Sequence, residues 1–370
     1  MRRSRTLTRY VAREVVLYTL LGLTLIGAIL LLRNLGRALD ELLGAGFQAS
    51  DVWAVLRVIG TMLLLYALPV SFLFGVLLAV ARMSSDVEIV AMRACGIGVR
   101  DLAVPILALS LACSGVTFWL ARDVEPAARR EMRDLLASLI ARGAGLQPGR
   151  FRHFGDVLVY VDGRGGDRLH GIVVSDRSDP ERPLIVFASE GRLALDANGS
   201  VTLALERGDI HLDESEALGE RDVRISFERF DYALDLAELL GDNAKQRPKE
   251  MSWSDLRAAV ARARGSEPSP QLPDEPIEYE LDLQRRLAAP LAPALFGLIG
   301  LPIGMRRARG ARAFGALWCA GIAFSYYGAQ IFFASLAEQG WLSAAAARWI
   351  PVASFAALAA VLLARSRRGT

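Results

Sequence analysis

Several residue types that energy-using membrane proteins rely on are scarce in this sequence. Only two lysines, Lys245 and Lys249, occur among its 43 basic residues, and neither follows a glycine. The chain therefore has no G-x-x-x-x-G-K-[ST] phosphate-binding loop, and it cannot hydrolyse a nucleotide by that route. Aspartate and glutamate are absent from the six apolar runs described below, whereas ion-coupled carriers usually place ionisable groups in mid-membrane. Energy for any transport should therefore come from another protein.

Cysteine and histidine are equally sparse, with three of each. Cys95 falls in a short loop while Cys113 and Cys319 fall inside apolar runs, so no disulfide framework is implied. The histidines, His153, His170 and His211, have no metal-ligand spacing to one another or to cysteine. Since the G-x-S-x-G and H-E-x-x-H signatures are also missing, the sequence favours a binding or assembly role over catalysis.

Long apolar runs, by contrast, are abundant, and hydrophobic residues make up 53% of the 370-residue chain. Six runs are long enough to cross the roughly 30 Å of a bilayer's hydrocarbon as helices. They cover residues 15–32, 58–81, 102–121, 287–305, 313–337 and 349–364, the last beginning nearer Trp341. The first run could be a cleaved secretory signal, but it exceeds the about 7 to 15 apolar residues of a signal, and no small-residue cleavage site follows. The expected fold is an α-helical membrane protein with six transmembrane helices, three on each side of a hydrophilic insert.

The distribution of arginine predicts the orientation, since short cytoplasmic loops carry an excess of basic residues. With a cytoplasmic N-terminus, the inner segments hold fifteen arginines: Arg2, Arg3, Arg5, Arg9, Arg13, Arg82, Arg93, Arg100, Arg306, Arg307, Arg309, Arg312, Arg365, Arg367 and Arg368. The outer short loops hold only Arg33, Arg37, Arg57 and Arg348. Both termini should therefore be cytoplasmic, with membrane segments 1–121 and 287–370 and an exported domain at 122–286.

The insert is expected to combine helices with a β domain. Residues 123–142 have the apolar spacing of an amphipathic helix that extends the third span outward. From about 150 to 235, short alternating runs follow one another, and "DANGS" between two of them is typical of a hairpin. Several short strands at this spacing favour a sandwich, a jelly roll or an open barrel. A second helix at 254–264 and a Pro-rich linker lead back to the membrane.

The stretch "SSDVEIVAMRACGIGVRD", residues 84–101, predicts a short helix between the second and third spans. Ser85 and Glu88 have the spacing of a capping box and Gly96 is a natural stop, which places the helix within 85–96. At 100° per residue, one stripe should pack on the protein's own bundle: Val87, Val90, Ala91 and Ala94. The opposite stripe should face outward as a docking surface: Asp86, Glu88, Ile89, Met92 and Arg93. A helix lying on lipid headgroups is the alternative, but it would favour several basic residues and few acids.

Three groups of residues resemble the LptF/LptG family of lipopolysaccharide export permeases. "EIVAMRACGIG", from residue 88, is similar to the family's coupling-helix motif, and "LPIGMRRARGAR" to its Pro-to-basic-Gly loop. "ASEGRLALDANGSVTLALERGDIHL" and "RDVRISFERFDYAL" look like the strand repeats of its exported β-jelly-roll. The resemblance covers nearly the whole chain, and "MRACG" with "RDVRISFERFDY" looks more like the F-type subunit than the G-type.

The resemblance implies a transport subunit of the Gram-negative inner membrane and a set of partners. These would be a paralogous G-type permease, a dimer of identical cytoplasmic ATPases and a single-span protein with its own jelly roll. This chain would hold no cofactor, since ATP and magnesium would bind the ATPase, and no nucleic acid partner is expected. Lipopolysaccharide would enter laterally from the outer leaflet, and ATP-driven closure would push it into the jelly-roll bridge.

Three sets of side chains are the candidates for these roles. Glu88, Ile89, Met92 and Arg93 would transmit the motion of the ATPase. Arg33 and Arg37, and along the first helix of the insert Arg129, Arg130 and Arg133, would bind lipid phosphates, which arginine grips bidentately. For Arg33 and Arg37, ordinary snorkelling to the interface is the alternative. Phe324, Tyr327, Gln330 and Ile331 in the fifth span would line the lipid cavity.

Two other classes of function fit the same composition. An enzyme acting on lipid-linked sugars would need an acid/base pair near the membrane, and Asp123 with Glu125 is the only nearby cluster, beside Pro126. A mechanical or sensory subunit would pass ATPase strokes to the exported domain without moving lipid.

Overall fold

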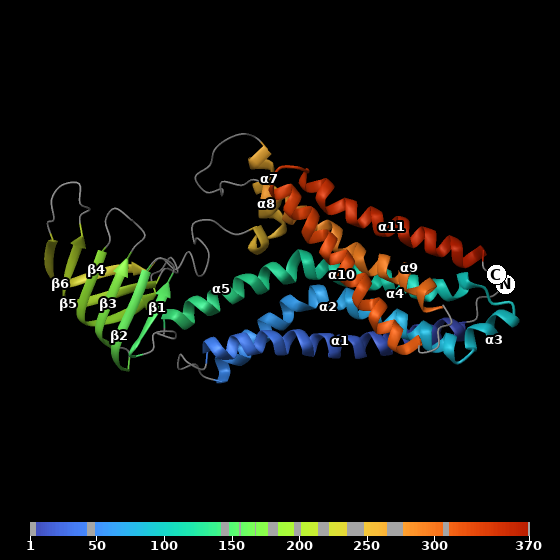
Figure 1. Cartoon of the computed structure of the whole chain (residues 1–370), viewed down its shortest axis with the longest axis horizontal. Helices are drawn as coiled ribbons and strands as arrows, with labels where there is room; N and C mark the ends of the chain where they lie inside the picture. Colours follow the sequence, from blue (N-terminus) through green and yellow to red (C-terminus); the bar gives the residue numbers. More distant parts are fainter. Residues whose placement is uncertain are drawn as a thin grey trace. The chain divides into compact units, whose positions relative to one another are not determined.

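The computed structural model contains two compact units, which are described separately (Figure 1). The residues that it describes are 5–42, 49–141, 148–154, 157–166, 168–176, 184–195, 201–213, 222–234, 248–264, 277–305 and 311–368. Unit 1 comprises Met1–Leu32, Gly60–Ala128 and Pro248–Thr370, and unit 2 comprises Arg33–Ile59 and Arg129–Arg247.

Long helices dominate the chain outside the insert. Before the strands come α1 (Arg5–Leu42), α2 (Ala49–Ser85), α3 (Glu88–Ala94), α4 (Val99–Trp119), the π-helical turn η1 (Leu120–Val124) and α5 (Glu125–Ala141). After them come η3 (Pro248–Glu250), α7 (Trp253–Arg264), α8 (Ile277–Ala288), η4 (Ala289–Leu291), α9 (Ala292–Gly304), α10 (Ala311–Glu338) and α11 (Ala344–Arg368).

Six of these helical stretches are long and apolar enough to cross a membrane, which confirms the predicted number. They are Thr6–Arg33, Val52–Ser85, Asp101–Leu135, Ile277–Gly304, Gly315–Glu338 and Ala344–Arg365. The third continues from α4 through η1 into α5, so the helix predicted at 123–142 does extend the third span. The fourth begins in α8, ten residues before the apolar run, because polar residues such as Asp282 and Arg286 are buried against other helices there.

Helix α9 occupies the centre of unit 1. It is apolar all round, and most of its residues are buried, including Phe296 and Ile299. Its glycines lie against α2: a Cβ added at Gly300 would come within 3.0 Å of Val76 Cγ1. Lipid provides no hydrophobic drive between helices, so close approach through small residues is how such a bundle gains its packing energy.

Unit 2 contains the predicted β domain. Its strands are β1 (Arg150–Phe154), β2 (Val157–Gly165), β3 (Arg168–Asp176), β4 (Leu184–Leu195), β5 (Val201–Asp213) and β6 (Asp222–Leu234). All neighbours pair antiparallel in the order β1-β2-β3-β4-β5-β6, and the Leu195↔Val201 pairing confirms the hairpin predicted at "DANGS". Within the described residues the six strands form one antiparallel sheet in meander order.

The sheet curls around its own apolar face. Alternate residues of β2, Val157, Val159 and Val161, are buried together with Ile172 from β3 and Leu203 from β5. At the far strand, the Tyr232 hydroxyl donates a hydrogen bond of 2.5 Å to Asp176 Oδ2 on β3. Since β3 and β6 are not paired neighbours, this bond requires the sheet to bend over the cluster.

Candidate functional site

The short helix α3 begins differently from the prediction. The capping box of Ser85 and Glu88 is absent, because α2 continues through Ser85, whose hydroxyl donates to the Arg82 carbonyl instead. Val87 precedes the helix at φ 62°, a left-handed conformation that is rare for a β-branched residue. The predicted stop at Gly96 is confirmed, with φ +78°.

The burial of α3 differs in part from the prediction: Ile89 and Met92 of the expected docking stripe face the bundle, whereas Asp86 and Arg93 are exposed as predicted. Ile89 is 4% exposed, and Met92 packs against the same buried cluster of unit 1. The side chains of Val87 and Val90 are 52% and 40% exposed. On a two-turn helix both stripes contain apolar residues, so the spacing alone could not decide which of them the bundle would bury. The exposed apolar surface of α3, called here the outward face, consists of Val87, Val90, Ala91 and Ala94, and Asp86 and Arg93 are also exposed.

Polar contacts connect α3 to α1 and to the end of α9, which is itself bonded to the end of α2. The Tyr10 hydroxyl on α1 donates to Glu88 Oε2 at 2.8 Å. On the other side, Arg93 Nη2 lies 3.9 Å from Met305 Sδ, directly after α9. The Ser84 hydroxyl, near the end of α2, donates to the Met305 carbonyl at 3.3 Å. Of the four residues predicted to transmit motion, Ile89 and Met92 therefore pack on the bundle, Glu88 is bonded to α1, and Arg93 is exposed.

The five arginines predicted to bind phosphate all belong to unit 2. Arg33 is exposed in the last part of α1, and the side chain of Arg37 lies outside the described part of the chain. Arg129, Arg130 and Arg133 lie half-buried along α5. The start of α2 meets α5 in this unit, because Arg57 forms an ion pair with Glu131.

The predicted cavity residues of α10 divide between two faces. Phe324 and Ile331 are 81% and 70% exposed. Tyr327 points into the bundle, where its ring centroid lies 6.0 Å from that of Tyr66. Gln330 also points inward, donating to the Arg348 carbonyl at 3.3 Å. Only the first two are placed to contact a lipid or another subunit directly.

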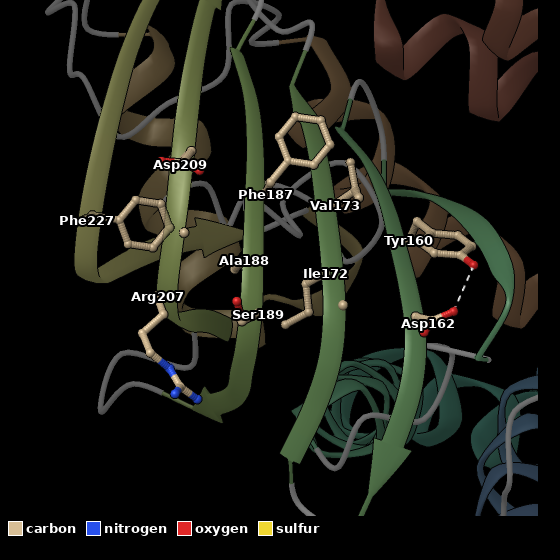
Figure 2. Close-up of a pocket in the computed structure, with 12 residues that line it drawn as sticks. Tyr160, Asp162, Ile172, Val173, Phe187, Ala188, Ser189, Arg207, Asp209 and Phe227 are labelled. Carbon is tan, nitrogen blue, oxygen red and sulfur yellow. Dashed lines mark hydrogen bonds between the residues drawn. The ribbon is translucent and has the colours of Figure 1, made fainter.

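An open hollow of about 680 Å³ lies on the sheet of unit 2. Figure 2 shows the rings of Tyr160, Phe187 and Phe227 standing along it, with Arg207 near one end. Asp209, also in its lining, accepts hydrogen bonds from Arg224 and Ser226, and these hold the pKa of its carboxyl below the usual value. The aromatic side chains with charged edges suit an amphipathic ligand, and this hollow was not predicted, because strand alternation does not reveal how the paired strands bring these side chains together.

The acid/base pair required by the enzyme hypothesis is not assembled. Asp123 is exposed and lies 3.6 Å from Arg122, whereas Glu125 is 2% exposed and forms an ion pair of 2.8 Å with Arg285. In the described ranges no group of three His, Cys, Asp or Glu residues could hold a metal ion.

The buried partner of Glu125 is part of a cluster that the sequence did not reveal. Asp282, Arg285 and Arg286 were not among the predicted functional residues, yet all three are mostly or fully buried. Their i, i+3 and i, i+4 spacing on α8 was the one available signal.

Comparison with known proteins identifies the class of membrane protein. Curated proteins give no match to this chain. Among protein families, the lipopolysaccharide export system permease LptF/LptG matches residues 9–365, which includes all six membrane helices, α3 and the β domain. The chain therefore belongs to the LptF/LptG permease family, and it is a multi-pass transport component of the inner membrane.

Proposed function

We propose that this chain is the F-type permease subunit of an ABC-type lipopolysaccharide exporter. It extracts lipopolysaccharide from the inner membrane and passes it to a periplasmic β bridge, while a separate cytoplasmic ATPase dimer supplies the energy. A G-type permease would complete the membrane cavity, and a single-span jelly-roll protein would continue the bridge. Family membership supports the transport role, and the geometry of α3 supports its coupling to an ATPase.

The observation that carries the proposal is that α3 exposes an apolar face while other residues of the same helix contact the bundle. Val87, Val90, Ala91 and Ala94 expose a small apolar surface that a groove on an ATPase can cover, as amphipathic helices are bound elsewhere. A push on that surface reaches α1 through Tyr10 and the end of α9 through Met305. Ile89 and Met92 anchor the helix in the bundle, while Glu88 and Arg93 contact α1 and Met305, so these four residues pass on the force that the outward face receives.

The arrangement of the helix ends supports the proposed orientation. The beginning of α1, the helix α3 and the end of α11 lie at one end of unit 1 (Figure 1). Leu363 of α11 and Ile89 of α3 also pack in one apolar cluster. Together with the arginine bias, this favours two cytoplasmic termini on the side of the ATPase.

Lipid contact is proposed for the exposed residues of α1 and α10. Arg33 and Arg37 near the end of α1 would meet the phosphates of lipid A, with Arg129, Arg130 and Arg133 on α5 as further contacts in the same unit. Phe324 and Ile331 would line the membrane cavity. The hollow beside Phe187 offers apolar surface for acyl chains beyond it.

The coupling is tested by co-expressing the chain with the other exporter subunits and purifying the complex in detergent. Val90→Glu places a charge in the centre of the outward face, and we expect it to abolish co-purification of the ATPase. Ile225→Glu is the matched control, because Ile225 is 46% exposed on the β domain and Val90 is 40% exposed. Normal ATPase recovery with Val90→Glu would contradict the assignment of the outward face.

Lipid passage is tested with a photo-reactive residue at Phe324. We expect ATP-dependent labelling by lipopolysaccharide in membranes that contain the complete complex. ATPase binding without any lipid labelling would instead support a mechanical or sensory subunit.

A further inference from the structure

A set of four buried charges, called here the ionic clamp, joins three parts of unit 1. It consists of Glu125, Asp282, Arg285 and Arg286, with exposed side-chain fractions of 2%, 3%, 12% and 0%. Charged side chains are rarely buried unless they are paired, because removal of an ion from water is unfavourable. The transport role described above uses none of the four.

Arg286 binds the segment of chain that returns from the β domain. Its Nε donates to Asp282 Oδ2, its Nη1 to the Met251 carbonyl and its Nη2 to the Pro248 carbonyl, each at 2.9 Å. The planar guanidinium thus holds a carboxylate and two backbone carbonyls in fixed directions, which a lysine could not do with a single ammonium. The turn η3 is tied to α8 by these bonds.

Arg285 binds the segment of chain that leads out to the β domain. Its Nη2 donates to Glu125 Oε2 at 2.8 Å, and its Nε donates to Asp282 Oδ1 at 2.9 Å. Its Nη1 donates to the Tyr66 hydroxyl on α2 at 3.3 Å. Asp282 therefore links the two arginines, with one carboxylate oxygen facing each of them.

The two segments held by the clamp are the start of α5, which leads towards the β domain, and the turn η3, where the described chain resumes after that domain. Glu125 is the first residue of α5, and the chain passes from unit 1 into unit 2 after Ala128. Pro248 is the first residue of the returning part of unit 1. Trp253 adds a further contact between them, since its ring lies 6.5 Å from that of Phe118 on α4.

A π-helical turn directly precedes the clamp. Residues Leu120–Val124 form η1 between α4 and α5. Single π turns inside α-helices often mark functional sites, because the extra residue weakens the local hydrogen-bond ladder. The ion pair of Glu125 with Arg285 therefore holds α5 directly after this irregular turn.

We propose that the ionic clamp is a positioning device for transport, which holds the outgoing and returning connections of the β domain in one geometry so that helix movement reaches that domain. The role of the clamp in transport rests on the proposed function, whereas the clamp itself consists of residues of this chain alone. Buried ion pairs add little net stability compared with apolar residues of the same size, but they are strict about geometry. A fixed geometry of this kind is required if a movement of the helices is to reach the β domain.

The clamp is tested first by proteolysis with endoproteinase Lys-C, which cuts after lysine. The chain has only Lys245 and Lys249, so Lys245→Arg leaves a single site, inside the turn η3 that Arg286 holds. Arg286→Met should accelerate cleavage at Lys249 on the order of tenfold, because a protease needs the turn to open. Arg257→Met is the matched control on the neighbouring helix, where Arg257 is exposed. Equal rates of cleavage at Lys249 in the Arg286→Met variant and in the Lys245→Arg background protein would contradict the proposal that Arg286 holds η3.

The positioning role is tested separately in the assembled complex. Glu125→Gln keeps the size of the side chain but removes the charge that pairs with Arg285. We expect the lipopolysaccharide extracted from proteoliposomes per ATP hydrolysed to fall about twofold or more, with hydrolysis itself retained. An unchanged ratio would overturn the positioning role, since a purely structural residue lowers the yield of complex and leaves the ratio alone. If the complex without substitutions extracts no lipid, the proposed function fails, while the Lys-C result still decides whether the clamp exists.

Discussion

The contact between α1 and α2 at Gly75 provides the sharpest test of the packing. A Cβ built at Gly75 would lie 2.2 Å from Thr19 Oγ1, 2.7 Å from Thr19 N and 2.9 Å from Thr19 Cα. Two of these atoms are backbone, so a new side-chain rotamer cannot relieve the overlap. Because carbon atoms pack favourably at about 3.5–4.0 Å, α1 would have to withdraw by roughly 1 Å in Gly75→Ala.

The expected effect is the balance of two terms of similar size. Overpacking in a well-packed interior destabilises by about 1–3 kcal/mol. Replacement of a helical glycine by alanine stabilises by about 1 kcal/mol. Gly75→Ala should therefore lower the free energy of unfolding by up to about 2 kcal/mol. Gly60→Ala on the same helix is the control, because a Cβ at Gly60 meets no described atom within 4 Å and only the helix term remains.

The assay is equilibrium unfolding of the purified chain in mixed micelles titrated with sodium dodecyl sulfate, followed by tryptophan fluorescence. The two alanine variants should move the midpoint in opposite directions. A Gly75→Ala protein as stable as the Gly60→Ala protein would refute the close approach of α1 and α2. Since α1 also carries Tyr10, the same variant should weaken ATPase coupling in the complex.

Three further predictions concern the backbone at α3 and the β domain. Val87→Gly should raise the stability of the chain by about 1 kcal/mol, since glycine accepts a left-handed conformation, yet it should weaken ATPase co-purification by removing part of the outward face. Ile172→Ala should lower the free energy of unfolding by about 2–5 kcal/mol by opening a cavity at a residue that is 1% exposed, whereas Ile225→Ala should change it by about 0.5 kcal/mol or less. Asp209, whose pKa is lowered first by the hydrogen bond from Arg224, should add stability that is full above its unfolded pKa and is lost as the pH falls through the lower folded pKa. Asp209→Asn should therefore flatten the acid side, below about pH 4, of a melting-temperature profile of the purified chain.

Some features could be predicted from the sequence because they depend on local composition. The six spans follow from apolar runs longer than about 18 residues, and the strands from alternation within about 150 to 235. The helix in residues 84–101 and its stop at Gly96 follow from turn chemistry. The family resemblance predicted the same export permease class that residues 9–365 match.

Other features depend on which distant residues meet. The predicted capping box at Ser85 is absent because α2 continues through Ser85, and part of the predicted docking stripe is covered because Ile89 and Met92 pack in an apolar cluster of unit 1. Tyr327 and Gln330 were predicted to line the cavity together with Phe324 and Ile331. The structure shows that these two side chains point into the bundle, because the sequence alone does not reveal which face of α10 is buried.

The sequence by itself determined that the chain crosses a membrane six times, exposes an inserted β domain and cannot hydrolyse a nucleotide through a phosphate-binding loop. These properties follow from hydrophobicity, strand alternation and missing residue types, which need no knowledge of contacts. Only the tertiary structure decided which face of α3 is open and that Glu125, Asp282, Arg285 and Arg286 form one buried cluster. Residues 125 and 285 are far apart in the chain, and whether a charge is solvated or paired is settled only when the helices pack.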